Sequence, residues 1–96
     1  MNHEFYVYML ECSDKSYYVG HTDNLEKRLA EHAEGLSSYT SKRLPVKIIY
    51  VESFQTRDEA FAAERKIKGW SRKKKEALII RDFKFVKDYS KKKFNS

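Results

Sequence analysis

The sequence predicts an α+β fold, in which a small, largely antiparallel three-stranded sheet is flanked by three helices. Three observations point to this class. Two short segments rich in aromatic and β-branched residues lie on either side of a turn, as in a hairpin. Three later stretches carry apolar residues at helical spacing, and a third short apolar segment separates the first two of them. The predicted order is therefore strand, strand, helix, strand, helix, helix.

The first two strands are expected at residues 5–10 and 17–19, joined by turn residues at 13–16. They form an antiparallel hairpin. Because side chains alternate between the faces of a strand, Tyr6 and Tyr8 share one face. Gly20 either ends the second strand or lets another backbone approach closely.

The first helix is expected over residues 23–34, with Asp23 as its cap and Glu26 completing a capping-box pattern. Gly35 is a plausible stop. The side chains expected to point inward are those of Leu25, Leu29 and Ala33.

Residues 35–45 form a polar loop, and residues 46–51 the third strand. The second helix opens at Thr56, with Glu59 at the capping-box position, and is interrupted at Gly69. Its apolar side consists of Ala60, Phe61, Ala63, Ile67 and Trp70.

The third helix is expected from residue 72 to about residue 83, and its apolar stripe includes Ala77, Leu78 and Ile80. We divide the chain into a domain at 1–83 and a basic extension at 84–96.

Length and composition limit the function classes. The 96 residues imply one domain, and the lone Cys12 fits a small buried side chain in a reducing, cytoplasmic compartment. No apolar run approaches the ~20 residues of a membrane span, and the N-terminus lacks the pattern of a signal peptide.

The net charge of +6 is unevenly distributed. Residues 1–71 contain 10 Lys and Arg against 11 Asp and Glu, whereas residues 72–96 contain 10 against 3. Such asymmetry favours a polyanionic partner, nucleic acid before membrane. The alternative is a solvated lysine-rich helix and tail.

Three residues on the expected helices could carry chemistry. Arg28 and His32 are spaced i, i+4 and so share one helix face, where Arg could bind phosphate. The alternative is an exposed Arg and a partly packed His. Glu64 has apolar neighbours along one side, and a semi-buried carboxylate needs a metal, a cation or donors. The alternative is an ordinary pair with Lys68.

The triplets Tyr6-Val7-Tyr8 and Tyr18-Val19-Gly20, followed by a helix carrying Arg28, resemble the GIY-YIG nuclease family. The resemblance covers roughly residues 5–80 and is closest to its small stand-alone bacterial branch, including a loop pattern of Tyr39-Thr40, Arg43 and Pro45. The chain departs from the family pattern in having Tyr6 in place of a glycine and no matching asparagine after Glu64.

The resemblance implies a metal-dependent DNA endonuclease that hydrolyses phosphodiester bonds, on branched or damaged DNA. Glu64 would hold one divalent ion, Mg²⁺ or Mn²⁺, and Arg28 would stabilise phosphate charge. Tyr8 is the candidate general base, Tyr18 shares the site and His32 orients or relays. We also expect nucleic-acid contacts from Gly20, where space for a phosphate would open, and from His21, Lys42, Arg43, Arg72, Lys73, Lys74 and Lys75.

Two other readings stay open from the sequence. The chain could be a nucleic-acid-binding module that keeps the fold but has weak or no catalysis, or an interaction domain whose basic helix meets a protein. We expect a monomer, with DNA as the principal partner and a targeting protein as a further one.

Overall fold

The computed structural model describes residues 3–81. Its centre is an antiparallel sheet of β1 (Phe5–Glu11), β2 (Tyr17–Thr22) and β3 (Lys47–Phe54), in the order β2-β1-β3. This confirms the predicted fold class and order of elements. The predicted domain boundary after residue 83 and the basic extension lie outside the described residues.

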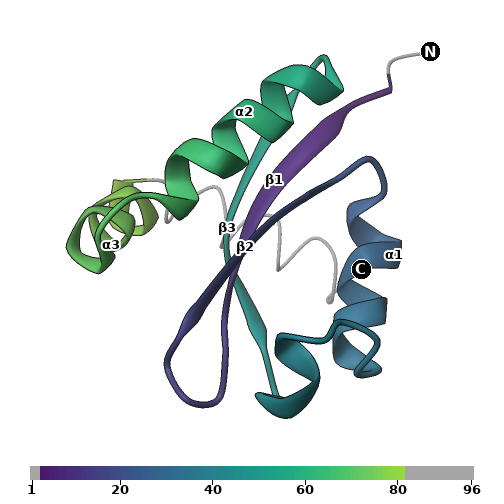
Figure 1. The fold of residues 1–96 in the computed structure, drawn as a ribbon. Coiled ribbons are helices and arrows are strands. Elements are labelled where there is room, and N and C mark those ends of the chain that lie inside the picture. The colour runs from purple at the N-terminus through teal and green to yellow at the C-terminus, as the bar shows by residue number, and fades with distance from the viewer. Residues whose placement is uncertain (1–2, 82–96) are drawn as a thin grey trace.

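Helices cover both faces of the sheet (Figure 1). Helix α1 (Leu25–Ala33) packs on one face, and α2 (Arg57–Lys68) and α3 (Arg72–Arg81) pack on the other. A short 3-10 helix, η1 (Thr40–Lys42), lies near α1 within the predicted polar loop. Over residues 3–81, no helix has the length and apolar character needed to cross a membrane.

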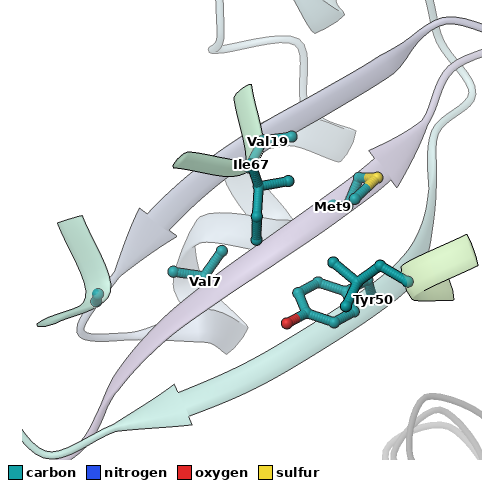
Figure 2. Packing of buried hydrophobic residues seen from close by; sticks show 7 residues of the cluster. Val7, Met9, Val19, Tyr50 and Ile67 are labelled. Carbon is teal, nitrogen blue, oxygen red and sulfur yellow. The ribbon is translucent and has the colours of Figure 1, made fainter. Parts of the chain in front are cut away.

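Alternation along β1 divides the core into two clusters. Val7 and Met9 point toward α2, where they pack with Val19, Tyr50 and Ile67 (Figure 2). The alternate residues of β1, Tyr8 and Leu10, face α1. They form the second cluster with Leu25 and Val51. Each strand therefore contributes side chains to two separate environments. Cys12 is buried, as predicted.

Helices α1 and α2 begin in different ways. In α2 the predicted capping box is confirmed: the Glu59 amide donates to Thr56 Oγ1 at 3.1 Å, and the Thr56 amide donates to Glu59 Oε1 at 3.2 Å. In α1 the predicted cap is wrong, because Asn24 Oδ1 accepts from the Lys27 amide at 3.1 Å. Asp23 instead pairs with Arg57 Nη2 at 3.4 Å.

The apolar stripes also differ from prediction at several positions. Ala33 is exposed, and the buried residue in the last turn of α1 is His32. In α3 only Leu78 of the predicted stripe is buried, whereas Ala77 and Ile80 are exposed. Phe61 on α2 is exposed as well. The stop at Gly35, which has φ +79°, is consistent with the structure.

Gly20 lies inside β2, so of the two alternatives the one in which it ends the strand is wrong. It pairs with Tyr8 on β1, and the Tyr8 ring lies across it. A Cβ at this position would come within 2.6 Å of the Tyr8 hydroxyl oxygen and 2.8 Å of Tyr8 Cζ. The missing side chain therefore makes room for Tyr8, not for a phosphate.

We predict that Gly20→Ala destabilises the fold by about 1–3 kcal/mol, because the added Cβ would overlap with the fully buried Tyr8 side chain. Gly69→Ala is the matched control, because a Cβ there meets only backbone oxygens at 3.6 and 3.8 Å and Gly69 has helical dihedral angles. Urea unfolding of both variants measures the difference. Equal stabilities for the two variants would contradict this account of Gly20.

Candidate active site

The predicted catalytic and metal-binding residues lie around β2, which is an edge strand of the sheet. Tyr18 packs with the cluster beneath α1, whereas Val19 packs with the cluster beneath α2. Gly20 and His21 continue this alternation. The predicted site residues therefore form two groups on opposite faces of one strand.

The α1 face holds a buried chain of hydrogen bonds. The Tyr8 hydroxyl lies 2.8 Å from His32 Nε2, and His32 Nδ1 lies 2.8 Å from Thr40 Oγ1. All three residues have no exposed surface. These two hydrogen bonds connect β1, α1 and η1, so they fix the position of the loop relative to the sheet. The sequence reasoning assigned no role to Thr40, whose partner is eight positions away.

Burial sets the charge of this group. Burial, reinforced by the positive charge of Arg28, lowers the pKa of His32 to about 4, so the imidazole is neutral near pH 7. Burial, with a smaller effect of Tyr18, raises the pKa of the Tyr8 phenol, which stays protonated. A neutral imidazole has one donor and one acceptor nitrogen. His32 can therefore accept the Tyr8 proton at Nε2 while donating from Nδ1 to Thr40.

Arg28 lies beside this chain. Burial opposes its charge, but hydrogen bonding to Glu31 and the proximity of the Tyr8 and Tyr18 hydroxyls outweigh that effect and raise its pKa. Arg28 Nη1 lies 3.1 Å from Glu31 Oε1. Arg28 also lines a cavity of ≈ 390 Å³, together with His3, Thr22, Asp23, Asn24, Lys27 and Glu31. The cation therefore connects the buried tyrosine with an open, polar space.

Tyr18 is the more accessible of the two predicted catalytic tyrosines. It is half-buried, whereas Tyr8 has no exposed surface. Its ring packs against that of His32, with centroids 4.9 Å apart, and against that of Tyr39, with centroids 5.8 Å apart. Of the four predicted catalytic residues, all of which the structure describes, Tyr18 and Arg28 are thus the two that solvent can reach.

The α2 face holds Glu64, which is 7% exposed. Its Oε1 lies 2.6 Å from His21 Nδ1 and its Oε2 lies 3.1 Å from Lys68 Nζ. Burial opposes the charge, but these two contacts outweigh it and lower the pKa of the Glu64 carboxyl. The sequence left two alternatives open for Glu64, a semi-buried carboxylate that needs a metal, a cation or donors, and an ordinary pair with Lys68. The structure shows Glu64 both buried and paired with Lys68.

The donor set limits what metal Glu64 could hold. Within residues 3–81, no three or more His, Cys, Asp and Glu side chains come together as a metal site. Mg²⁺ commonly keeps several waters and takes one or two carboxylates together with substrate phosphates. A single ionised carboxylate fits that mode of binding. Each oxygen of Glu64 has one partner and keeps a further lone pair, so a metal could bind the carboxylate while His21 and Lys68 stay in place.

The predicted nucleic-acid-binding cations lie in different environments. Arg43 stacks over Tyr39, with Cζ 3.9 Å from the ring centroid, near the α1 face. Arg72 stacks over Tyr17 at 4.1 Å and Nη1 donates to the Lys15 carbonyl at 2.7 Å. The remaining predicted cations are exposed or half-buried: Lys42, Lys73, Lys74 and Lys75. Those on α3 lie on the α2 side of the sheet and are not grouped with Arg28.

Several known proteins are similar to this chain in sequence. Residues 4–77 match the family model of the GIY-YIG catalytic domain. A UPF0213 protein of Listeria monocytogenes is 49% identical over 78 residues, which is 80% of this chain and 88% of the relative. A UPF0213 protein of Streptococcus pneumoniae is 45% identical over 80 residues, which is 82% of this chain and 81% of the relative.

A solved structure shows the same fold. The solution NMR structure of a UPF0213 protein from Bacillus halodurans superposes with a TM-score of 0.60 at 35% sequence identity. The match covers 92% of this chain and 95% of the other.

The buried His32 should make stability depend on pH. Its folded-state pKa is about 4 and its ordinary value is 6.5, so the unfolded chain binds more protons between these limits. We therefore predict that the free energy of unfolding is highest above pH 6.5 and falls by up to about 3 kcal/mol on acidification toward pH 4. Urea unfolding across this range measures the fall, and His32→Gln should flatten it.

A second measurement does not require a folded variant. The imidazole resonances of His32, followed by NMR, should not titrate above pH 5. A His32 that titrates near pH 6.5 would contradict the neutral, buried assignment.

Proposed function

The chain belongs to the GIY-YIG family, and from this membership we propose that it is a metal-dependent endonuclease that hydrolyses phosphodiester bonds in DNA. The observation that carries the proposal is the position of Arg28. Its guanidinium lies beside two tyrosine hydroxyls and opens onto a polar cavity. A fixed cation next to phenol hydroxyls suits a phosphate whose charge grows in the transition state.

Arg28 and Tyr18 make the first contacts with the substrate in this proposal. The guanidinium exchanges its bond to Glu31 for two phosphate oxygens, since its forked donors match that geometry. The Tyr18 hydroxyl, which solvent can reach, donates to the same phosphate or orients the attacking water.

Tyr8 acts from behind this layer. Its raised pKa leaves almost no free phenolate near pH 7, so it cannot serve as a pre-ionised base. It can take a proton from water only as its own proton passes to His32 Nε2, 2.8 Å away. Because Tyr8 has no exposed surface, DNA binding must first uncover its hydroxyl.

Glu64 would hold the ion, Mg²⁺ or Mn²⁺. A bound divalent ion would supply Lewis-acid stabilisation of phosphate charge and lower the pKa of bound water. The chain's own contribution is to keep the carboxylate ionised through His21 and Lys68. Since Glu64 and Arg28 lie on opposite faces of β2, DNA that contacts both must pass along the outer edge of this strand.

Several finer assignments are also part of the proposal. The substrate would be branched or damaged DNA, a partner protein would supply targeting, and the enzyme would act as a cytoplasmic monomer. The alternative function is a nucleic-acid-binding module without turnover. The zero exposure of Tyr8 is the observation that favours this alternative.

A cleavage assay tests the proposal directly. The protein is incubated with duplex, single-stranded, flapped and four-way-junction DNA, with Mg²⁺, with Mn²⁺ and with a chelator. We predict metal-dependent cutting that falls about 10²–10³-fold in Arg28→Ala, the loss expected when a transition-state donor is removed. Arg81→Ala is the matched control, because Arg81 is an exposed arginine in the last turn of α3, on the other side of the sheet from Arg28.

Glu64→Gln should lose metal-dependent cutting while it still folds and binds DNA. Cutting by Glu64→Gln at the wild-type rate would remove Glu64 from the mechanism. No cutting of any substrate by the wild type, with DNA binding intact, would support the binding-module alternative.

The lysines in the first turn of α3 allow a separate prediction about DNA binding. If Lys73, Lys74 and Lys75 contact phosphates, their replacement by Gln should weaken DNA binding and reduce the slope of log affinity against log salt by about 2–3. Binding at several salt concentrations measures this slope. Lys47→Gln, on β3, is a control for loss of charge. An unchanged slope in the triple variant would mean that these lysines are only solvated.

A further inference from the structure

Planar side chains form a row that leads from the buried site to the surface. His32 packs against Tyr18, with ring centroids 4.9 Å apart, and Tyr18 packs against Tyr39, with centroids 5.8 Å apart. The Arg43 guanidinium then lies 3.9 Å from the centre of the Tyr39 ring. The row therefore begins at the proposed catalytic residues and ends on a flat cation.

The outer end of the row is both accessible and held in place. Tyr39 is 37% exposed, and the Arg43 side chain is 34% exposed. Arg43 Nη1 donates to the Tyr39 carbonyl at 2.7 Å, and its Nε donates to Asp14 Oδ2 at 3.2 Å. Asp14 accepts in turn from the Ser16 amide at 3.0 Å. The guanidinium plane is thus fixed from two sides before any ligand arrives.

Resting on the proposed nuclease function, we propose that Tyr39 and Arg43 form a platform on which an unpaired nucleobase stacks, next to the phosphate held by Arg28. Nucleobases stack on tyrosine rings and on guanidinium planes. Stacking on such a surface tolerates any base, because every base has a π-face. In duplex DNA the neighbouring base pairs already cover these faces.

The position of the platform gives it a specific consequence. Tyr18 contacts Tyr39 through its ring and Arg28 through its hydroxyl. Only the Tyr18 side chain therefore separates a phosphate bound at Arg28 from the platform, so a base of the same or a neighbouring nucleotide could reach it. The preferred substrate is DNA that is single-stranded or unpaired beside the bond to be cut.

A purely structural role for Arg43 is the competing explanation. Its carbonyl accepts from the Ser13 amide at 2.9 Å, and its side chain reaches Asp14, so it also joins the polar loop to the turn between β1 and β2. That role predicts lower stability on substitution, without a preference between forms of DNA. The test must therefore separate base stacking from folding.

Binding with a chelator present measures the platform without cleavage. The probes are a short single-stranded oligonucleotide and a duplex of the same sequence. We expect Arg43→Lys and Tyr39→Leu to bind the single strand about tenfold more weakly, which lies within the effect of losing one stacked base. Duplex affinity should stay within about twofold. Arg57→Lys is the control at another exposed arginine and should change neither.

A fluorescent base gives a readout that folding alone does not change. Wild-type protein should quench 2-aminopurine in the single strand, and Arg43→Lys, which keeps the charge, should reduce that quenching. Thermal melting identifies any variant that fails to fold, and the wild-type quenching remains decisive in that case.

Failure of this inference differs from failure of the proposed function. Absence of quenching by the wild type, or an equal loss of single-strand and duplex affinity in the variants, would overturn the platform even if the protein cuts DNA. A selective loss of single-strand binding in a protein that cuts no DNA would keep the platform and overturn the nuclease.

Discussion

The buried hydrogen bond between Tyr8 and His32 is the interaction on which the rest of the site depends. A phenol and an imidazole removed from water need partners, because an unsatisfied buried polar group is costly. Within residues 3–81 no buried side-chain nitrogen or oxygen lacks a hydrogen-bond partner. Tyr8 reaches His32 across Gly20, and His32 reaches Thr40. A single chain of contacts thus fixes the sheet, α1 and the polar loop together.

The edge strand β2 brings two different electrostatic environments close together. On its α1 face, burial keeps Tyr8 and His32 uncharged, while Arg28 remains a cation. On its α2 face, His21 and Lys68 keep Glu64 ionised despite its burial. A phosphate needs a cation, and a metal needs an anion, so this separation is chemically useful. A long substrate can meet both only because β2 has no further strand beside it within the described sheet.

The sequence predicted the parts of the structure that local rules control. Alternation and helical spacing gave the elements, and the Thr56–Glu59 pattern gave the start of α2. The start of α1 was wrong because Asp23 and Asn24 can both cap a helix, and pairing of Asp23 with Arg57, 34 residues away, favours Asn24. The apolar neighbours of Glu64 made its burial one of two alternatives, and the structure shows it buried although Phe61, one of those neighbours, is exposed. By contrast, the spacing of Arg28 and His32 indicated a shared helix face but not that, of the two, only His32 is fully buried. The role of Thr40 depends on its contact with His32, which forms only once the loop packs against α1.

Net charge alone does not identify the surface that meets DNA. Arg72 is engaged by Tyr17, Glu76 and a backbone carbonyl, and Arg43 by Tyr39 and Asp14. Such arginines offer orientation and a flat face, whereas the lysines of α3 offer compact ammonium charges. A row of planar groups in contact, which includes Arg43, approaches the site on the α1 face, and the lysines lie on the α2 side. Binding strength would then come from the lysines on the α2 side of the sheet, and substrate choice from the planar groups on the α1 side. For this reason the basic composition predicts a polyanionic partner but not the form of DNA that the protein binds.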